Sequence, residues 1–309
     1  MNKLFLKKGL SLDRLNSLIQ VVDSGGIAAA APGDPVRQSQ FSRQISQLET
    51  FFGANLTERS GKGIRITREG RELARISRRF VASLEEFHGR ASTRNFEIRI
   101  AASGTVLDWL VIPVIVDLRL KFPELQIQLI GMKTKDTAEA VRDGLADIGV
   151  IRKSAVISSF RLEANGEIPV RYQLFCSSEL ARKHHYETTR ILEEIPLVTN
   201  MGGEFRDRME SILFSGEKLS KNPVRIECSS FREAMGILKR DRGVCAILPT
   251  WARTELLLDN QYAGIDLPTL ENYDRSLTVI IDSKQLENRP FLRKFSRQFN
   301  ARLCDDSEN

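Results

Sequence analysis

The side chains best suited to chemistry in this sequence are short polar groups mixed with basic ones, and most of them gather near the N-terminus. The residues that stand out are Arg37, Gln38, Ser39, Ser42 and Arg43, followed further along by Arg59 and Lys62. Glutamine, serine and arginine side chains form hydrogen bonds to base edges and phosphates. Lysine and arginine also neutralise phosphate charge. This combination predicts a surface that binds double-stranded DNA.

Net positive charge is concentrated in the same part of the chain. The 309 residues include 46 lysines and arginines and 40 acidic residues, which gives a formal net charge of +6. Residues 1–90 hold fifteen of the basic and nine of the acidic residues, so the whole excess lies in the first third. The asymmetry indicates a small polyanion-binding module joined to a neutral body, although a basic surface that only meets solvent has the same composition.

Helical and extended patterns place the polar residues on elements that can present them. Apolar residues recur at helical spacing over 12–22, a short helix fits 27–31, and residues 32–35 have the composition of a turn. A third helix fits 38–51, and residues 56–67 form two extended arms around a Gly-Lys-Gly tip. The second and third helices, joined by a tight turn and followed by a basic hairpin, match a winged helix-turn-helix. In that motif the later helix, here residues 38–51, enters the major groove.

A longer amphipathic helix is expected after the hairpin, over residues 68–90. Leu73, Ile76, Phe80, Leu84 and Phe87 recur at intervals of three and four residues, which is the spacing of a coiled-coil seam. The other faces carry charged side chains, and residues 91–95 have the composition of a hinge. We expect this helix to connect the basic module to the rest of the chain.

Strands and helices alternate after residue 95. Strands fit 96–102, 125–130 and 147–151 with helical patterns between them, and further strands fit 170–176, 197–199, 225–228 and 244–248. Further helices fit 203–215, 231–239 and 289–303. Strand–helix–strand repeats predict an α/β body with a parallel sheet.

Polar residues at the ends of these strands predict a small-molecule pocket, because ligands bind α/β sheets at strand carboxyl ends and helix N-termini. Ser103 and Thr105 follow the first strand, and Arg152 follows the strand 147–151. Thr199, Asn200 and Met201 follow another strand. The set favours a small anionic ligand such as a carboxylate, while Ser103 is equally accounted for as an ordinary helix N-cap.

Several other function classes find little support. Four scattered cysteines without a CxxC pair, and only three histidines, disfavour a metal site or a disulfide scaffold. No GxSxG, HExxH, Walker or GxGxxG motif occurs, so we expect neither an enzyme nor a cofactor. An α/β enzyme or solute-binding module with an N-terminal interaction helix stays as the alternative. Runs without a charged residue reach only ten residues and no secretory signal is visible, which favours a cytoplasmic protein without membrane contact.

Several longer motifs follow one another in a set order. The N-terminal ones are Val36-Arg-Gln-Ser-Gln-Phe-Ser-Arg-Gln-Ile-Ser-Gln-Leu-Glu49, Phe52-Gly-Ala-Asn-Leu-Thr-Glu-Arg59 and Gly61-Lys-Gly-Ile-Arg-Ile-Thr-Arg-Glu-Gly70. The later ones are Ala102-Ser-Gly-Thr105, Phe122-Pro123, Gly144-Leu-Ala-Asp-Ile-Gly149 and Arg242-Gly-Val-Cys-Ala-Ile-Leu-Pro249. This series resembles LysR-type transcriptional regulators over nearly the whole chain, and most specifically in residues 36–70.

The resemblance implies an architecture. A winged helix-turn-helix would occupy residues 1–67, a linker helix and hinge 68–94, and an effector-binding domain 95–309. That last domain would be similar to a periplasmic binding protein, with α/β subdomain I at about 95–163 and 268–303 and subdomain II at about 164–267. Two crossover strands, near 161–169 and 264–269, would join the subdomains, and a small effector would bind between them.

The resemblance also implies a function and an assembly. The chain would regulate transcription, and an effector would control the geometry of the oligomer. Residues 68–90 would form a homodimer, and two dimers a tetramer. In the family, positions matching Arg37, Gln38, Ser42 and Arg43, with Ser39 beside them, face DNA, and Arg59 and Lys62 match wing contacts. Some members sense peroxide through a cysteine pair, so Cys176 and Cys228 leave redox sensing as an alternative. A constitutive DNA binder without an active effector pocket is another.

One segment departs from the family pattern. Family members have Ser-Phe-x-x-Ala-Ala-x-x-Leu before the turn, whereas this chain has Gly26-Ile-Ala-Ala-Ala-Ala-Pro-Gly-Asp34. Asp34 therefore stands where a leucine is normally buried, and Pro32-Gly33 is expected to end the second helix early. The number of residues up to Val36 is unchanged, so the third helix can still be presented to DNA.

Overall fold

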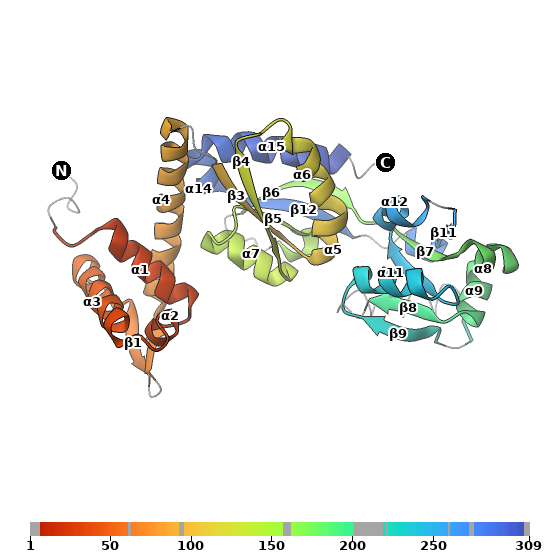
Figure 1. Cartoon of the computed structure of the whole chain (residues 1–309), viewed down its shortest axis with the longest axis horizontal. Coiled ribbons are helices and arrows are strands. Elements are labelled where there is room, and N and C mark those ends of the chain that lie inside the picture. Colours follow the sequence, from red (N-terminus) through yellow and green to blue (C-terminus); the bar gives the residue numbers. More distant parts are fainter. Residues whose placement is uncertain are drawn as a thin grey trace.

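The chain folds into a small helical domain, one long helix and two α/β subdomains (Figure 1). This arrangement is seen in a computed structural model, which describes residues 7–60, 63–92, 96–156, 162–200, 219–220, 222–258, 260–271 and 275–305. Across those residues, no helix is both long and apolar enough to cross a membrane. The helix expected over 203–215 lies outside the described residues.

The N-terminal domain is a winged helix-turn-helix, as the sequence predicts. It consists of α1 (Leu12–Asp23), α2 (Ile27–Ala30), α3 (Pro35–Phe52) and the hairpin β1 (Thr57–Ser60) and β2 (Gly63–Ile66). Ser11 caps α1 by accepting a hydrogen bond from the Arg14 N–H, and Gly53 ends α3 in the left-handed conformation that glycine permits. Leu18, Ile45 and Leu48 are fully buried between the helices and form the centre of this domain's core.

Subdomain I is built on a five-stranded sheet in the order β4-β3-β5-β12-β6. Its strands are β3 (Phe96–Ala102), β4 (Leu125–Gly131), β5 (Ile148–Arg152), β6 (Leu162–Pro169) and β12 (Ser276–Asp282). Its helices are α5 (Gly104–Val106), a π-helical turn (Leu107–Val111), α6 (Ile112–Arg119), α7 (Thr134–Asp143), α14 (Ser283–Asn288) and α15 (Pro290–Asp305), and a 3-10 turn follows β5 at Lys153–Ala155. Strands β3, β4 and β5 are parallel, as predicted, whereas β12 runs antiparallel to both β5 and β6.

Subdomain II contains the second five-stranded sheet, in the order β11-β7-β10-β8-β9. Its strands are β7 (Tyr172–Ser177), β8 (Leu197–Asn200), β9 (Val224–Cys228), β10 (Cys245–Pro249) and β11 (Tyr262–Asp266). Its helices are α8 (Ser178–Lys183), α9 (Thr188–Glu194), α11 (Phe231–Arg240), a 3-10 turn (Thr250–Ala252) and α12 (Arg253–Leu256), and α13 (Pro268–Glu271) follows β11. Here β7 pairs antiparallel with β10 and β11, so this sheet is also mixed.

The two subdomains are joined by two passages of the chain, as the sequence suggested, but the first passage lies later than expected. The whole of β6 pairs with β12, so residues 164–169 extend the first sheet rather than the second. The chain then passes through Val170 and Arg171 into β7, and it returns between β11 and β12. The alternating pattern of residues 162–169 suits a strand in either sheet, so the sequence alone could not assign it.

The long helix α4 (Arg68–Ser92) stands between the helix-turn-helix and subdomain I (Figure 1). It packs on α1 from one side and on α7, α14 and β3 from the other. Arg78 donates to the Asp143 carbonyl oxygen over 3.0 Å, and Arg79 donates to the Arg142 carbonyl oxygen over 2.9 Å. These bonds fix the helix on the last turn of α7.

A buried ion network fixes the other half of α4. Glu86, which is 5% exposed, accepts a hydrogen bond from the Phe291 N–H over 2.8 Å and lies 3.3 Å from Arg289 Nε. Arg289 in turn contacts Asp147 at the start of β5, over 2.5 Å between Nη1 and Oδ1. Helix α4 is therefore attached to subdomain I at two places, around Arg78 and Arg79 and around Glu86.

Candidate nucleic-acid interface and effector pocket

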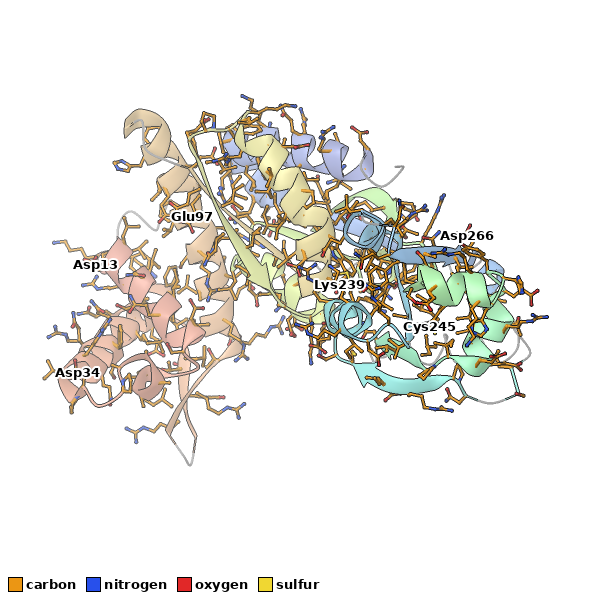
Figure 2. All side chains as sticks on the ribbon, turned by 45° about the vertical axis from the view of Figure 1, so that its right-hand side comes forward. Asp13, Asp34, Glu97, Lys239, Cys245 and Asp266 are labelled. Atoms are coloured by element: carbon orange, nitrogen blue, oxygen red, sulfur yellow. The ribbon has the colours of Figure 1, made fainter. Side chains whose placement is uncertain are left out.

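The unusual turn before α3 is the start signal of that helix. Asp34 is exposed, and its carboxylate accepts a hydrogen bond from the Arg37 N–H over 2.9 Å, so it acts as the N-cap. Pro35 occupies the first helical position, which needs no donor. Gly33 adopts φ +73°, a conformation that favours glycine. Figure 2 shows Asp34 at the outer edge of this domain. The helix consequently begins at Pro35, earlier than the predicted residue 38.

One face of α3 points away from the protein. Phe41, Ile45 and Leu48 are buried against α1 and α2, whereas the opposite face exposes polar side chains. The exposed residues of this outward face are Val36, Ser39, Gln40, Arg43, Ser46 and Gln47. They recur at intervals of three and four residues, so a single side of the helix can meet one groove of DNA.

The predicted DNA contacts divide into outward and inward groups. Arg37, Ser39, Ser42 and Arg43 are exposed. Gln38 is half-buried instead, and its amide nitrogen donates to the Ala31 carbonyl oxygen over 2.8 Å. That bond ties α3 to the end of α2.

Arg37 also has contacts within the domain. Its guanidinium donates to the Gln20 side-chain oxygen over 3.3 Å and lies 5.5 Å from the centre of the Phe41 ring. On the wing, Arg59 is exposed on β1, while Lys62 lies outside the described residues.

The sequence analysis missed one member of the outward face. Val36 is 80% exposed and can contact a thymine methyl group. Counting back in steps of three and four from Ser39 and Gln40 would have found it. Gln47 lies three turns beyond Val36 on the same side. The same count separates Gln40, which is exposed, from Gln44, whose side chain accepts a hydrogen bond from Ser17 of α1.

A cavity of about 730 Å³ lies between the two α/β subdomains. Subdomain I contributes Ser103, Gly104, Thr105, Val106, Gly131, Met132, Lys133, Thr134, Lys135, Arg152 and Leu277 to its walls. Subdomain II contributes Asn200, Ser229, Ser230, Phe231, Pro249 and Trp251, and the passages between the subdomains add Val170, Tyr172 and Arg275. The cavity is large enough for a small metabolite.

The walls of this cavity are positive. Lys133, Lys135, Arg152 and Arg275 line it, and among the residues described there no aspartate or glutamate joins them. Arg275 donates to the Tyr172 hydroxyl over 2.8 Å, which fixes its position. The first residues of α5, α7 and α11 also lie on the wall, and backbone N–H groups at helix N-termini attract anions.

Four of the six predicted effector residues meet at this cavity: Ser103, Thr105, Arg152 and Asn200. Ser103 stands at the N-cap position of α5, as the alternative reading of this residue expects, but its hydroxyl makes no capping hydrogen bond. Thr199 is 5% exposed and does not line the cavity, and its hydroxyl has no hydrogen-bond partner in the part of the chain that the structure describes. Met201 lies outside the described residues. Lys133, Lys135 and Arg275 were missed because the start of α7 and the segment before β12 are far apart in the sequence.

Direct contacts bridge the two subdomains next to the cavity. The Trp109 indole N–H, from the π-helical turn, donates to Glu255 of α12 over 2.8 Å. Arg232 of α11 lies 3.4 Å from the Asp108 carboxylate and also pairs with Glu255. Partial burial alone would raise the pKa of Glu255, but its hydrogen bonds to Trp109, Lys239 and Arg232 hold the pKa below its usual value. The carboxylate therefore stays ionised and keeps the bridge intact.

The cysteines are poor candidates for redox or metal chemistry. Cys176 and Cys245 face each other across the β7–β10 pair and are fully buried. Burial raises the pKa of Cys176 to about 11 and raises that of Cys245 further. Figure 2 shows Cys245 deep inside subdomain II. Burial, and then the Glu233 charge, also raises the pKa of Cys228. In the part of the chain that the structure describes, no group of side chains is arranged to hold a metal.

Two family models match the chain. The description of one is "Bacterial regulatory helix-turn-helix protein, lysR family", over residues 12–71, and that of the other is "LysR substrate binding domain", over residues 92–303. A relative described as "Probable hydrogen peroxide-inducible genes activator", from Mycobacterium leprae, is 25% identical over 231 residues, which cover 71% of this chain and 70% of that protein. The BenM transcriptional regulator of Acinetobacter baylyi is 29% identical over 143 residues, covering 45% of this chain and 47% of BenM.

Solved structures share the fold. A full-length OxyR variant from Pseudomonas aeruginosa superposes with a TM-score of 0.66 at 15% identity, covering 96% of this chain and 95% of that one. Full-length CbnR in complex with its target DNA gives a TM-score of 0.58 at 20% identity, covering 95% of this chain and 100% of that one.

Proposed function

We propose a working mechanism on the premise that this chain belongs to the LysR family of bacterial transcriptional regulators, whose two domain models cover residues 12–71 and 92–303. The chain is accordingly a transcriptional regulator with a DNA-binding helix-turn-helix and an effector-binding domain. This is a family of regulators and not of enzymes. Because the partner of such a protein is the bacterial chromosome, we place its site of action in the cytoplasm.

The outward face of α3 carries the proposal for DNA. Arg43 lies at its centre, with Ser39 and Gln47 on either side and Val36 at its start. We assign Arg43, Ser39 and Ser42 to base and phosphate contacts in the major groove, and Arg37 and Arg59 to phosphates beside it. Gln38 is better assigned to positioning α3, because its amide already bonds to α2. Lys62, at the wing tip, keeps its assignment from the sequence.

The assembly follows from two exposed apolar stripes. On α4, Ile76, Phe80, Leu84 and Phe87 are 51%, 49%, 39% and 64% exposed. On α6, Ile112, Val116 and Leu120 at its end are 38%, 59% and 81% exposed. A homodimer through residues 68–90 would bury the first stripe. A second, separate stripe supplies a second interface, as a tetramer built from two dimers requires.

The effector is proposed to be a small anion, such as a carboxylate, bound in the cavity between the subdomains. The support is the set of four basic side chains and three helix N-termini on its walls. A thermal-shift screen with small carboxylates tests this assignment. We expect Arg152→Gln to abolish the shift. A ligand that stabilises the wild type and this variant equally would show that the effector does not bind in this cavity.

Selection of binding sites from random duplex DNA tests the DNA assignment. Purified full-length protein at two salt concentrations should enrich an imperfect palindrome, with affinity that falls as salt rises. Arg43→Ala is expected to weaken the selected site by about 1–3 kcal/mol for each recognition helix, while circular dichroism is unchanged. Arg190→Ala, which removes an exposed arginine paired with Glu187 in subdomain II, is the matched control. Equal affinity of Arg43→Ala and this control would show that α3 is not the recognition helix.

A further inference from the structure

A second cavity, of about 540 Å³, lies where α4 meets subdomain I. We call it the joint cavity. Its walls are Arg68, Arg71, Glu72, Arg75 and Arg79 from α4, Arg142 and Asp143 from the end of α7, Leu162 from β6, Asp282 from β12 and Lys284 from α14. It is separate from the effector pocket, with which it shares no lining residue.

The charges around the joint cavity do not balance. Its three carboxylates each have an arginine partner, in the pairs Arg75–Glu72, Arg79–Asp282 and Arg142–Asp143. These pairs leave three further basic side chains on the walls.

The three remaining cations are Arg68, Arg71 and Lys284. Arg71 donates to the carbonyl oxygen of Ile66 over 2.8 Å, which holds the side chain without neutralising its charge. The Arg68 guanidinium and the Lys284 ammonium make no hydrogen bond or ion pair to any residue that the structure describes. Among the residues that the structure describes, three positive charges of the cavity therefore have no acidic partner.

The innermost arginine shows the strain of this crowding. Partial burial, and then the positive charge of Arg75, lower the pKa of Arg79 to about 10. The Nε atom of Arg79 is buried, and it has no hydrogen-bond partner among the described residues. A negative charge in the cavity would raise this pKa again, because it would stabilise the protonated guanidinium and oppose the charge of Arg75.

We propose that the joint cavity binds a small molecule carrying two or three negative charges on phosphate groups. Arginine side chains match phosphate oxygens in pairs of parallel hydrogen bonds, and a lysine adds a point charge. DNA fits this site poorly, because half of the wall belongs to subdomain I rather than to the DNA-binding domain. A ligand that contacts Arg68 and Lys284 together would tie α4 to α14.

Isothermal titration calorimetry of the full-length protein with inorganic pyrophosphate tests the proposal. We expect one pyrophosphate per chain at low salt. Arg68→Gln and Lys284→Gln should each weaken binding at least about tenfold, because each removes a charge-assisted hydrogen bond. Both side chains are exposed and have no ion-pair partner among the described residues, so the fold is expected to survive, which circular dichroism checks. Arg190→Gln is the charge-matched control and should bind like the wild type.

The other outcomes overturn the proposal in identifiable ways. If Lys135→Gln loses pyrophosphate while Lys284→Gln retains it, the anion binds in the effector pocket. Equal binding by all variants, or no binding by the wild type, means that the joint cavity holds no anion. If pyrophosphate does not bind but Arg68→Gln reduces the salt dependence of DNA binding, this arginine serves the DNA backbone instead.

Discussion

Replacing Arg289 by methionine tests whether α4 is held on subdomain I by the buried ion network. The Arg289 side chain is 5% exposed, and the side chains of its partners Glu86 and Asp147 are 3% and 1% exposed. Methionine keeps much of the side-chain volume but removes the charge that both carboxylates face. Glu86 would retain the Phe291 N–H, and Asp147 would retain Arg99, which bonds to it through its backbone N–H over 2.8 Å and its guanidinium over 3.3 Å.

Breaking one partner of a buried ion pair costs about 3–5 kcal/mol, because the remaining charge loses its compensation. At an m value of about 3 kcal/mol per molar urea, a loss of about 3 kcal/mol lowers the unfolding midpoint by about 1 M. Arg99→Met is the matched control. Arg99 also pairs with Asp147 but is 25% exposed, so we expect a smaller loss.

Acid unfolding gives an independent reading of the same network. Burial alone would raise the pKa of Asp147, but the charges of Arg289 and Arg99 hold it below the ordinary value of 3.8. Its contribution to stability is present above that ordinary value and is lost as the pH falls through the lower folded pKa. In Arg289→Met the folded pKa rises, so unfolding begins at a higher pH. Urea and acid titrations followed by circular dichroism measure both effects, and unchanged midpoints in both would refute the role given to this network.

Three further predictions address the dimer, the wing and the thiols. Phe80→Glu puts a charge in the centre of the α4 stripe, so we expect monomers in sedimentation velocity, and a persistent dimer would place the interface elsewhere. Gly70→Ala brings a Cβ well inside van der Waals distance of the Leu56 carbonyl oxygen. The winged domain should therefore melt at a lower temperature, while the melting of the α/β body is unaffected. Equal melting temperatures of the winged domain in the variant and the wild type would mean that α4 can move away from the hairpin. At pH 7, a pKa of about 11 leaves about one Cys176 thiol in ten thousand ionised, against about one in a hundred at the ordinary value of 9.0. Reaction of Cys176 with a disulfide reagent should therefore be at least about a hundredfold slower in the native than in the unfolded protein, and equal rates would contradict its burial.

The elements of the DNA-binding domain could be predicted from the sequence because their signals are local. Helical spacing, a glycine stop and the hairpin tip each lie within a few residues of the structure they specify. The turn at Asp34 was the exception. A comparison with the family pattern treats Asp34 as a lost core leucine, whereas its carboxylate is the N-cap of α3 and Pro35 the first helical residue. Aspartate is a common N-cap residue and proline a common first helical residue, so Asp34-Pro35 predicts that α3 begins at Pro35.

The pocket could be predicted only in part. Residues at strand ends were found, since parallel strands bring their carboxyl ends to one edge of a sheet. Lys133 and Arg275 were not, because their position depends on how the two subdomains pack. The joint cavity has no signal in the sequence at all. Its charge imbalance appears only when the arginines of α4 are placed beside Lys284.

The attachment of α4 limits how an effector signal can reach DNA. Glu86, Arg78 and Arg79 bind α4 to subdomain I, and Figure 1 shows subdomain II on the far side of subdomain I from this helix. We expect an effector bound between the subdomains to change the angle of subdomain II, whereas the contacts above hold α4 on subdomain I. We propose that this change reaches the recognition helices through contacts between copies of the chain, and the exposed stripe on α6 of subdomain I, which includes Val116, is one such contact surface. We therefore expect dimers separated by Val116→Glu to bind effector and DNA without coupling between the two.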